Sequence, residues 1–271
     1  MRNVNAIVDR AFDGLLSPLR PLPVNATLSI VAAVTAVALL FVVRATSNQP
    51  ALAAVKRQMH ADLLEIRLFN DDLVAMFRAE RDFLRHNVTY LRLSFVPALW
   101  TLIPLIIAMP QLDAYFGYRG MAVAQPILVT AQIVAPLDRQ AGLDLPPGVH
   151  SDTPAVWFPA LQQFVWRVAA DAPGDYVLRL RVGANSYDKT LHVSDLVARR
   201  SPVRTTAGFL SELFHPSELP MPSSGLVESI SVAYPERHVD VLGWHISWFL
   251  LYFAEVILFA VMLKRPLGVT L

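Results

Sequence analysis

The chain has 271 residues, of which 54% are hydrophobic and only 17% are charged, so it is more apolar than ordinary soluble domains are. Its net charge of +1 argues against a strongly basic surface for nucleic acid, so we expect no specific nucleic-acid partner. The absence of cysteine excludes a disulfide scaffold, a thiolate zinc site and a cysteine nucleophile.

The apolar residues are concentrated in three runs, Pro21–Val43, Leu93–Leu112 and Val241–Leu263. At a rise of about 1.5 Å per residue, a helix of each length covers the hydrocarbon core of a bilayer, which is about 30 Å thick. We therefore predict transmembrane helices at 21–44, 93–112 and 241–263. An amphipathic leader, 1–20, precedes the first span. This span is not typical of a cleaved signal peptide, because its apolar run is longer than the usual h-region and no A-x-A cleavage site follows promptly.

Basic residues predict the orientation of these spans. Arginine and lysine are frequent between the first two spans and directly follow the third, at Lys264 and Arg265. The positive-inside rule then places the N-terminus outside, 45–92 in the cytoplasm, 113–240 outside and the tail 264–271 in the cytoplasm. This describes a multi-pass protein of the plasma (inner) membrane. The three arginines of the leader favour the inverse topology, which stays open.

The cytoplasmic segment 45–92 has apolar residues at helical spacing, with charged residues on the other faces. Asn70-Asp71-Asp72 offers helix-capping side chains in its middle, which explains these carboxylates better than acid–base chemistry does. We predict a two-helix antiparallel coiled-coil hairpin. Met59 and Met76 are adaptable apolar residues that suit either the core of this hairpin or contact with another protein.

The outer segment 113–240 is rich in proline and glycine and alternates apolar with polar residues. This pattern predicts five strands, at 127–134, 164–168, 176–182, 187–193 and 226–234. Turn residues lie at 171–175 and 183–186, and 199–224 reads as a long loop with a short helix. With Trp166 as a core residue, the segment looks like an immunoglobulin-type β-sandwich. The predicted fold is thus a three-span helical membrane bundle with a helical hairpin and an inserted all-β domain.

Motifs that carry chemistry are absent: the chain has no nucleophile elbow, no glycine-rich phosphate loop and no H-E-x-x-H. Two pairs, His150 with Asp152 and His238 with Asp240, each supply two metal ligands at most, which is common by chance. We therefore expect neither an enzyme nor a metal site, and no cofactor.

Two charged residues in or beside the spans are candidates for function. A charge such as Glu255 costs about 2.5–3.5 kcal/mol at the centre of a bilayer, so Glu255 indicates either a hydrophilic cavity or a structural hydrogen-bonded pair. Arg44, at the end of the first span, suits either a snorkelling anchor or a positive charge lining a groove. Both lie toward the cytoplasmic ends of their predicted spans, so an Arg44–Glu255 pair is a further interpretation. Pro97, Pro104 and Pro110 are expected to kink the second span.

Three segments carry a resemblance to the YidC/Oxa insertase superfamily, in particular to its minimal three-span branch of archaeal YidC-like proteins and the third subunit of the ER membrane protein complex. Phe12–Pro23 (FDGLLSPLRPLP) resembles the short amphipathic leader of the archaeal proteins. Met76–Leu112 resembles their hairpin exit and second span, and Trp248–Val269 resembles their third span. The departure is 113–240, because family members usually have a short connection there.

The resemblance implies an insertase-like protein that assists client membrane proteins through a cytoplasm-facing hydrophilic groove, without nucleotide or cofactor. Arg44, Glu255, Met59 and Met76 are the implied groove and client-contact residues. The implied partners are nascent membrane proteins, the lipid bilayer and, at the hairpin, the ribosome; the ligand of the β-domain is unknown. The alternative is a cell-surface signalling module, in which an exterior immunoglobulin-like receptor domain is coupled to the cytoplasmic coiled coil.

Overall fold

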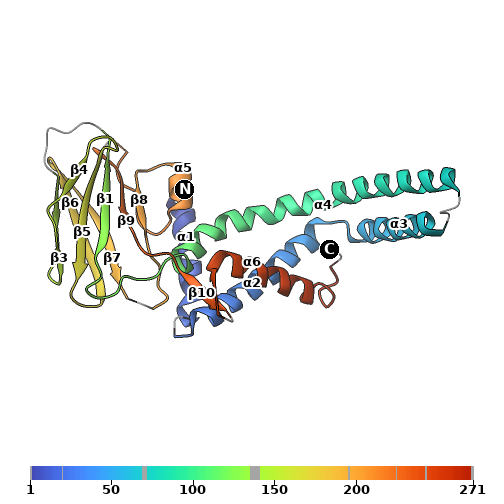
Figure 1. Ribbon diagram of the computed structural model, residues 1–271, viewed down its shortest axis with the longest axis horizontal. Helices are drawn as coiled ribbons and strands as arrows, with labels where there is room; N and C mark the ends of the chain where they lie inside the picture. The colour runs from blue at the N-terminus through green and yellow to red at the C-terminus, as the bar shows by residue number, and fades with distance from the viewer. Residues whose placement is uncertain are drawn as a thin grey trace. The chain divides into compact units, whose positions relative to one another are not determined.

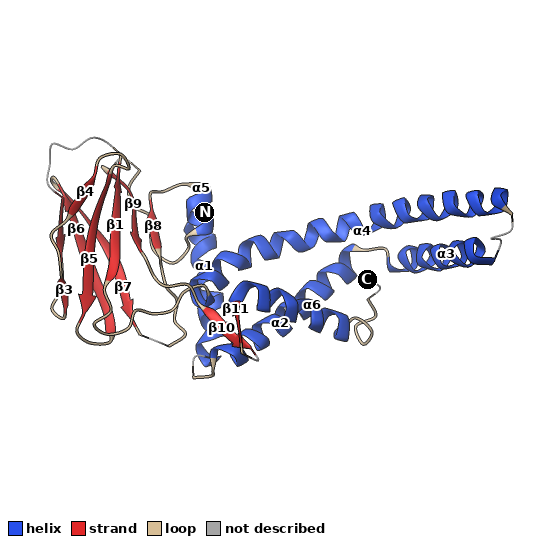
Figure 2. Ribbon diagram, in the orientation of Figure 1, coloured by secondary structure: helices blue, strands red, loops and turns tan. Residues whose placement is uncertain are grey.

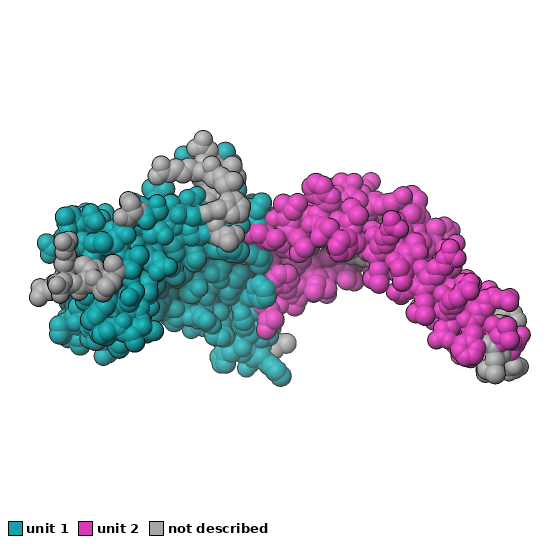
Figure 3. All heavy atoms as spheres, turned by 90° about the horizontal axis from the view of Figure 1, so that it is seen from above, with its two compact units in different colours: residues 1–27, 107–249 teal, residues 28–106, 250–271 magenta. Residues whose placement is uncertain are grey.

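The computed structural model describes residues 2–19, 21–68, 72–134, 141–194, 196–223, 225–241 and 243–269. The chain divides into two compact units (Figure 3). Unit 1 contains Met1–Thr27 and Ile107–Phe249, and unit 2 contains Leu28–Ile106 and Leu250–Leu271. Each unit is described separately below.

The fold combines helices with antiparallel β-sheets (Figure 1). The helices are α1 (Arg2–Leu16), α2 (Val24–Thr46), α3 (Gln49–Leu68), α4 (Leu73–Phe116), α5 (Phe209–Phe214) and α6 (Trp248–Leu263), with a 3₁₀ turn at Ser17–Leu19. The strands are β1 (Ile127–Ile133), β2 (Ala141–Asp144), β3 (Val149–Ser151), β4 (Val156–Phe158), β5 (Gln163–Ala170), β6 (Gly174–Val182), β7 (Asn185–Val193), β8 (Val203–Thr205), β9 (Val227–Val232), β10 (His238–Val241) and β11 (Trp244–Ser247).

Unit 1 contains two larger antiparallel sheets (Figure 2). The first has the strand order β3-β5-β1-β9-β8, with β4 also paired to β5, and the second has the order β2-β6-β7. Apolar side chains from both sheets form one buried core, to which β1 contributes Val129 and Ala131, β5 contributes Trp166, and β6 contributes Leu178 and Leu180. The predicted β-rich character of this segment is therefore confirmed.

Strand β6 shows why the alternating pattern predicts a sheet. Leu178, Leu180 and Val182 are buried, whereas Arg179 and Arg181 point to solvent. Each arginine pairs across the sheet, Arg179 with Asp188 of β7 (2.8 Å) and Arg181 with Asp144 of β2 (2.6 Å). The period of two thus separates the core face from the charged face, as the sequence pattern predicts.

The β6–β7 connection is a two-residue hairpin turn at positions 183 and 184, because Val182 pairs with Asn185. Gly183 has φ of +62°, a conformation that costs glycine little and that tight hairpin turns require. The prediction of a turn at this point is confirmed. Short strands were harder to predict: β8 lies inside the predicted loop 199–224, and β2, β3 and β4 were also missed.

Among the described residues, two helices are long and apolar enough to cross a membrane, by length and composition: Val24–Thr46 and Met76–Phe116. The first corresponds to the predicted span 21–44 and the second contains the predicted span 93–112. Helix α4 continues through Pro97, Pro104 and Pro110, so these prolines do not end it.

The third apolar run is not helical throughout. Residues 244–247 form β11, which pairs with β10 through Val239↔Ile246 and Asp240↔His245, and α6 begins only at Trp248. Helix α6 therefore has 16 residues, fewer than the predicted span 241–263. The physical reason is that β10 and β11 pair as a hairpin whose turn includes Gly243, with φ of +85°, a conformation that suits a turn and not a helix.

In unit 2, α3 lies beside the first half of α4 (Figure 1). The contacts between them include His86 Nδ1, which lies 2.6 Å from Asp62 Oδ2, and the Lys56 ammonium, which lies 5.4 Å from the centroid of the Tyr90 ring. Asp72 directly precedes α4, and its side chain accepts a hydrogen bond of 2.9 Å from the Val74 amide. This is the predicted capping interaction; Asn70 and Asp71 lie outside the described residues.

Candidate functional site

Polar side chains join the two apolar helices α2 and α6 of unit 2. The Ser29 hydroxyl donates a hydrogen bond of 2.8 Å to Glu255 Oε1, and the Tyr252 hydroxyl donates one of 3.0 Å to Thr35 Oγ1. Thr35 in turn donates to the Val31 carbonyl, as threonine commonly does inside a helix. We call Ser29, Thr35, Tyr252 and Glu255 the polar seam.

One atom of the polar seam lacks a protein partner. Glu255 Oε2 is buried and accepts no hydrogen bond from the residues that the structure describes, although Oε1 is satisfied by Ser29. A buried carboxyl oxygen without a donor is unfavourable, because it has lost its hydration and has received nothing in return. This oxygen can accept a hydrogen bond from a donor group that enters the seam.

Arg44 lies elsewhere on α2. It is fifteen residues from Ser29, which corresponds to about 22 Å along the helix. Its exposed side chain donates a hydrogen bond of 3.2 Å from Nη1 to the Leu267 carbonyl, beyond the end of α6. The structure thus does not bring Arg44 and Glu255 together, because Glu255 lies at the middle of α6 and faces Ser29, in the second turn of α2. A cation in the last turn of α2 is favoured by the helix dipole.

The remaining predicted residues occupy other parts of unit 2 or of α4. Met59 on α3 and Met76 on α4 are partly exposed, and neither belongs to the polar seam. Pro97 and Pro110 are buried, whereas Pro104 is exposed. The contacts that actually join α3 to α4, through Asp62 and His86, were not predicted; twenty-four residues separate them and no local pattern relates them.

The two His–Asp pairs considered in the sequence are His150 with Asp152 and His238 with Asp240. His150 Nε2 lies 3.4 Å from Asp152 and its Nδ1 lies 3.1 Å from Asp171, on an exposed surface. Asp240 pairs with His245 rather than with His238. Within the described part of the chain, no group of three or more His, Asp or Glu side chains has an arrangement that would hold a metal ion.

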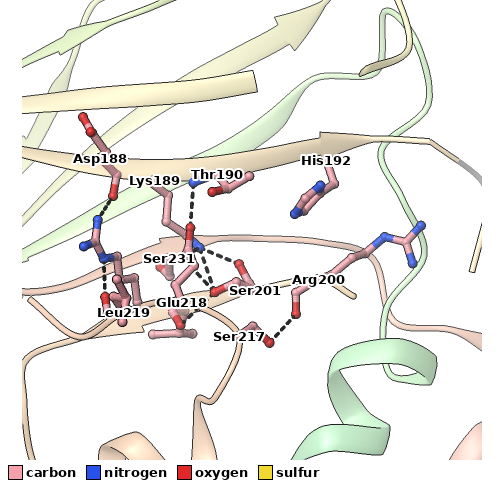
Figure 4. Close-up of polar contacts among 12 residues, drawn as sticks. Asp188, Lys189, Thr190, His192, Arg200, Ser201, Ser217, Glu218, Leu219 and Ser231 are labelled. Atoms are coloured by element: carbon pink, nitrogen blue, oxygen red, sulfur yellow. Dashed lines mark hydrogen bonds and ion pairs between the residues drawn. The ribbon is translucent and has the colours of Figure 1, made fainter. Parts of the chain in front are cut away.

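The β-rich part of unit 1 contains a buried ion pair, Lys189–Glu218, that no local pattern in the sequence indicates (Figure 4). Lys189, on β7, is almost completely buried with a 1% exposed side chain, and its ammonium pairs with Glu218. Lys189 Nζ also donates a hydrogen bond of 2.6 Å to the Ser201 carbonyl. Glu218 accepts hydrogen bonds of 2.8 Å from the Thr190 amide and from the Ser201 hydroxyl.

Each member of this network has its partners, which determines the protonation of the pair. Burial lowers the pKa of Lys189, against the attraction of Glu218. Burial by itself would raise the pKa of Glu218, but Lys189, the Thr190 amide and Ser201 together hold that pKa below its usual value. The lowered pKa favours the ionised form of Glu218, which accepts hydrogen bonds from Lys189, the Thr190 amide and Ser201.

Side chains from two other parts of unit 1 cover the free edge of β7. The amide of Thr190 is satisfied by Glu218, and the amide of His192 donates a hydrogen bond of 2.9 Å to the Tyr234 hydroxyl. Burial raises the pKa of Tyr234 to about 12, so this hydroxyl stays neutral. Side chains thus take the place of a further strand, which keeps the edge from pairing with other chains.

Compared with models of known protein families, the chain matches none, and no curated protein sequence matches it.

Proposed function

We propose that the protein is an insertase-like membrane protein that assists insertion or assembly of client membrane proteins. In this proposal, α2, the apolar half of α4 and α6 cross the membrane as a three-span bundle, with the N-terminus outside and the α3–α4 hairpin in the cytoplasm. The sheets of unit 1 form an immunoglobulin-like sandwich outside. The resemblance of 12–23, 76–112 and 248–269 to the YidC/Oxa superfamily supports this proposal, and no cofactor or nucleotide is needed.

The observation that carries the proposal is the polar seam, and within it the unpartnered oxygen of Glu255. Ionisable residues inside a membrane are costly and usually face a cavity or a polar partner. Here four polar side chains join two helices that otherwise consist almost entirely of apolar residues. Such a seam offers hydrogen bonds to the polar part of a client while the bundle around it stays apolar.

The mechanism follows from transfer free energies. A hydrophilic client segment loses its hydration in hydrocarbon, and side chains such as Arg44 and Glu255 replace part of that hydration. The apolar segment of the client gains free energy by entering the lipid, which drives insertion. Met59 and Met76, both partly exposed on the hairpin, are suited to first contact with a nascent chain.

A photo-crosslinking experiment tests the proposal. The crosslinking residue is placed at Phe41 on α2 and at Leu258 on α6, two apolar positions with more than half of the side chain exposed, in cells translating membrane proteins. Ala184, exposed in the β6–β7 turn, is the control position. We expect nascent membrane chains to be captured at positions 41 and 258 but not at 184. Absence of nascent chains at both helical positions would contradict the proposal.

One observation favours the alternative, an exterior binding module. Val134, Phe158 and Leu161 are exposed apolar residues of unit 1. They lie near one another, because the Leu161 amide donates a hydrogen bond to the Phe158 carbonyl. The amide of Ile133, next to Val134, donates to the carbonyl of Gln162, next to Leu161. Exposed apolar groups of this kind often mark protein contacts. A crosslinker at Phe158 that captures one specific envelope protein, with none captured at Phe41 or Leu258, would favour the binding module.

A further inference from the structure

Helix α1 turns its acidic side chains toward the rest of unit 1. Asp9 Oδ1 accepts hydrogen bonds of 2.7 Å from Gln111 Nε2 and of 2.6 Å from Arg199 Nη2. One turn later, Asp13 accepts a hydrogen bond from the Tyr115 hydroxyl and lies 3.7 Å from Arg199 Nη1. Asp9 and Asp13 are the acidic residues of this helix, so its acidic charge is directed inward.

The opposite side of α1 is apolar and exposed. Ile7 is 64% exposed and Leu15 is 49% exposed, with exposed Ala11 and Gly14 between them. Spacings of three and four residues place these positions on one helix face. A side chain added at Gly14 would meet no atom within 4 Å, so this face is open. Leu16 of α1 is buried, at 2% exposure, so the inward side of the helix carries apolar as well as acidic residues. Apolar residues therefore lie on both sides of α1, whereas a surface helix usually has them on the buried side alone.

Three contacts in unit 1 join α1 and the 3₁₀ turn that follows it to the ends of the apolar helices. Its acids bind Gln111 and Tyr115, at the C-terminal end of α4, where the apolar run 93–112 ends. At its own C-terminal end, the Leu19 carbonyl accepts a hydrogen bond of 3.3 Å from Thr27, in the first turn of α2. The exposed apolar face thus belongs to a helix that is tied to the ends of both apolar helices.

We propose that α1 lies in the interface of a phospholipid bilayer, with the face formed by Ile7, Ala11, Gly14 and Leu15 turned into the acyl chains. Arg10, exposed at the edge of this face, extends to lipid phosphate groups. A bilayer is the occupant that fits, because the face continues along the chain into exposed Leu22 and then into the apolar helix α2. The inference rests on the membrane crossing by α2 and α4 proposed above.

The absence of cysteine makes spin labelling a direct test. Single cysteines replace Ile7, Gly14 or Leu15 in the full chain, which is reconstituted in vesicles of phosphatidylcholine and phosphatidylglycerol. Electron paramagnetic resonance then measures collisions of the nitroxide with oxygen, which concentrates in lipid, and with a water-soluble nickel chelate. Leu102, exposed on the apolar part of α4, serves as the lipid reference, and Ala184 serves as the water reference.

We expect oxygen collisions to exceed nickel collisions at positions 7, 14 and 15, as at 102, with the opposite order at 184. Nickel-dominated collisions at 7, 14 and 15 with a lipid-like signal at 102 would overturn the inference and leave the membrane crossing intact. Protection from both reagents at those three positions would also overturn it, because a protein surface would then cover the face. A water-like signal at 102 would refute the proposed crossing itself, and the inference with it.

Discussion

The hydroxyl of Ser29 donates a hydrogen bond of 2.8 Å to Oε1 of Glu255, across 226 positions of the chain. This contact ties the first apolar helix to the last one at a point where both are otherwise apolar. Among the described residues, Oε2 of the same carboxyl group has no hydrogen-bond partner, so in the proposed function Glu255 would both join the helices and be available to a client.

Removal of the Ser29 hydroxyl is expected to destabilise the contact between α2 and α6. In Ser29→Ala, both oxygens of Glu255 lack a donor, which should lower the free energy of unfolding by about 1 kcal/mol, near the range for hydrogen bonds between membrane helices. Thermal unfolding in detergent measures the effect, and Ser29→Thr, which retains a hydroxyl, is the control. In a Glu255→Leu background, Ser29→Ala should have almost no effect; an equal loss in both backgrounds would show that the two residues do not interact.

Arg44 is expected to act by its charge. If it receives the hydrophilic end of a client, Arg44→Ala should lower the rate of client insertion into proteoliposomes by about tenfold, equivalent to about 1.4 kcal/mol. Arg44→Lys keeps a cation at the end of α2 and should retain most of the rate. Equal insertion by wild type, Arg44→Ala and protein-free vesicles would exclude the proposed role.

The buried pair Lys189–Glu218 predicts a large loss of stability when only one partner is removed. Lys189→Met leaves an ionised carboxylate buried without its cation, which should cost about 3–5 kcal/mol. The double variant Lys189→Met/Glu218→Leu removes both charges and should be more stable than Lys189→Met alone. Near-ultraviolet circular dichroism during urea unfolding reports on the aromatic core, and a double variant less stable than the single one would contradict this account.

The lowered pKa of Glu218 predicts a dependence of stability on pH. Because the folded state holds this carboxyl ionised more strongly than the unfolded state does, its contribution is complete above the ordinary glutamate pKa of about 4.3. The contribution is lost as the pH falls through the lower pKa of the folded protein. Urea unfolding across this acidic range should therefore show decreasing stability, with a weaker pH dependence in Glu218→Gln. Identical pH profiles for both proteins would refute the assignment.

The contact between Asp62 and His86 is expected to hold α3 against α4. Asp62→Asn weakens a partly buried hydrogen bond of 2.6 Å, so amides of α3 should exchange with deuterium about fivefold faster, corresponding to about 1 kcal/mol. Asp82→Asn is a matched control, because Asp82 pairs only loosely, at 3.8 Å, with exposed Arg81. Equal acceleration in both variants would point to a general charge effect instead.

Local patterns in the sequence determined much of the secondary structure. The period of two in 176–182 gave the buried and exposed faces of β6, and Gly183 marked its turn. The run of apolar residues gave α2, and Asp72 marked the start of α4. These features follow from interactions between residues only a few positions apart, which is why a sequence reveals them.

The tertiary structure decided what depends on distant partners. The apolar run 241–263 suits a helix locally, but pairing of β10 with β11 delays α6 to Trp248. The spacing of residues in α1 indicates an apolar and an acidic side, but only Gln111, Tyr115 and Arg199 determine that the acidic side faces inward. Likewise, the charge of Glu255 is visible in the sequence, whereas its partner Ser29 is not, because no local period relates residues 226 positions apart.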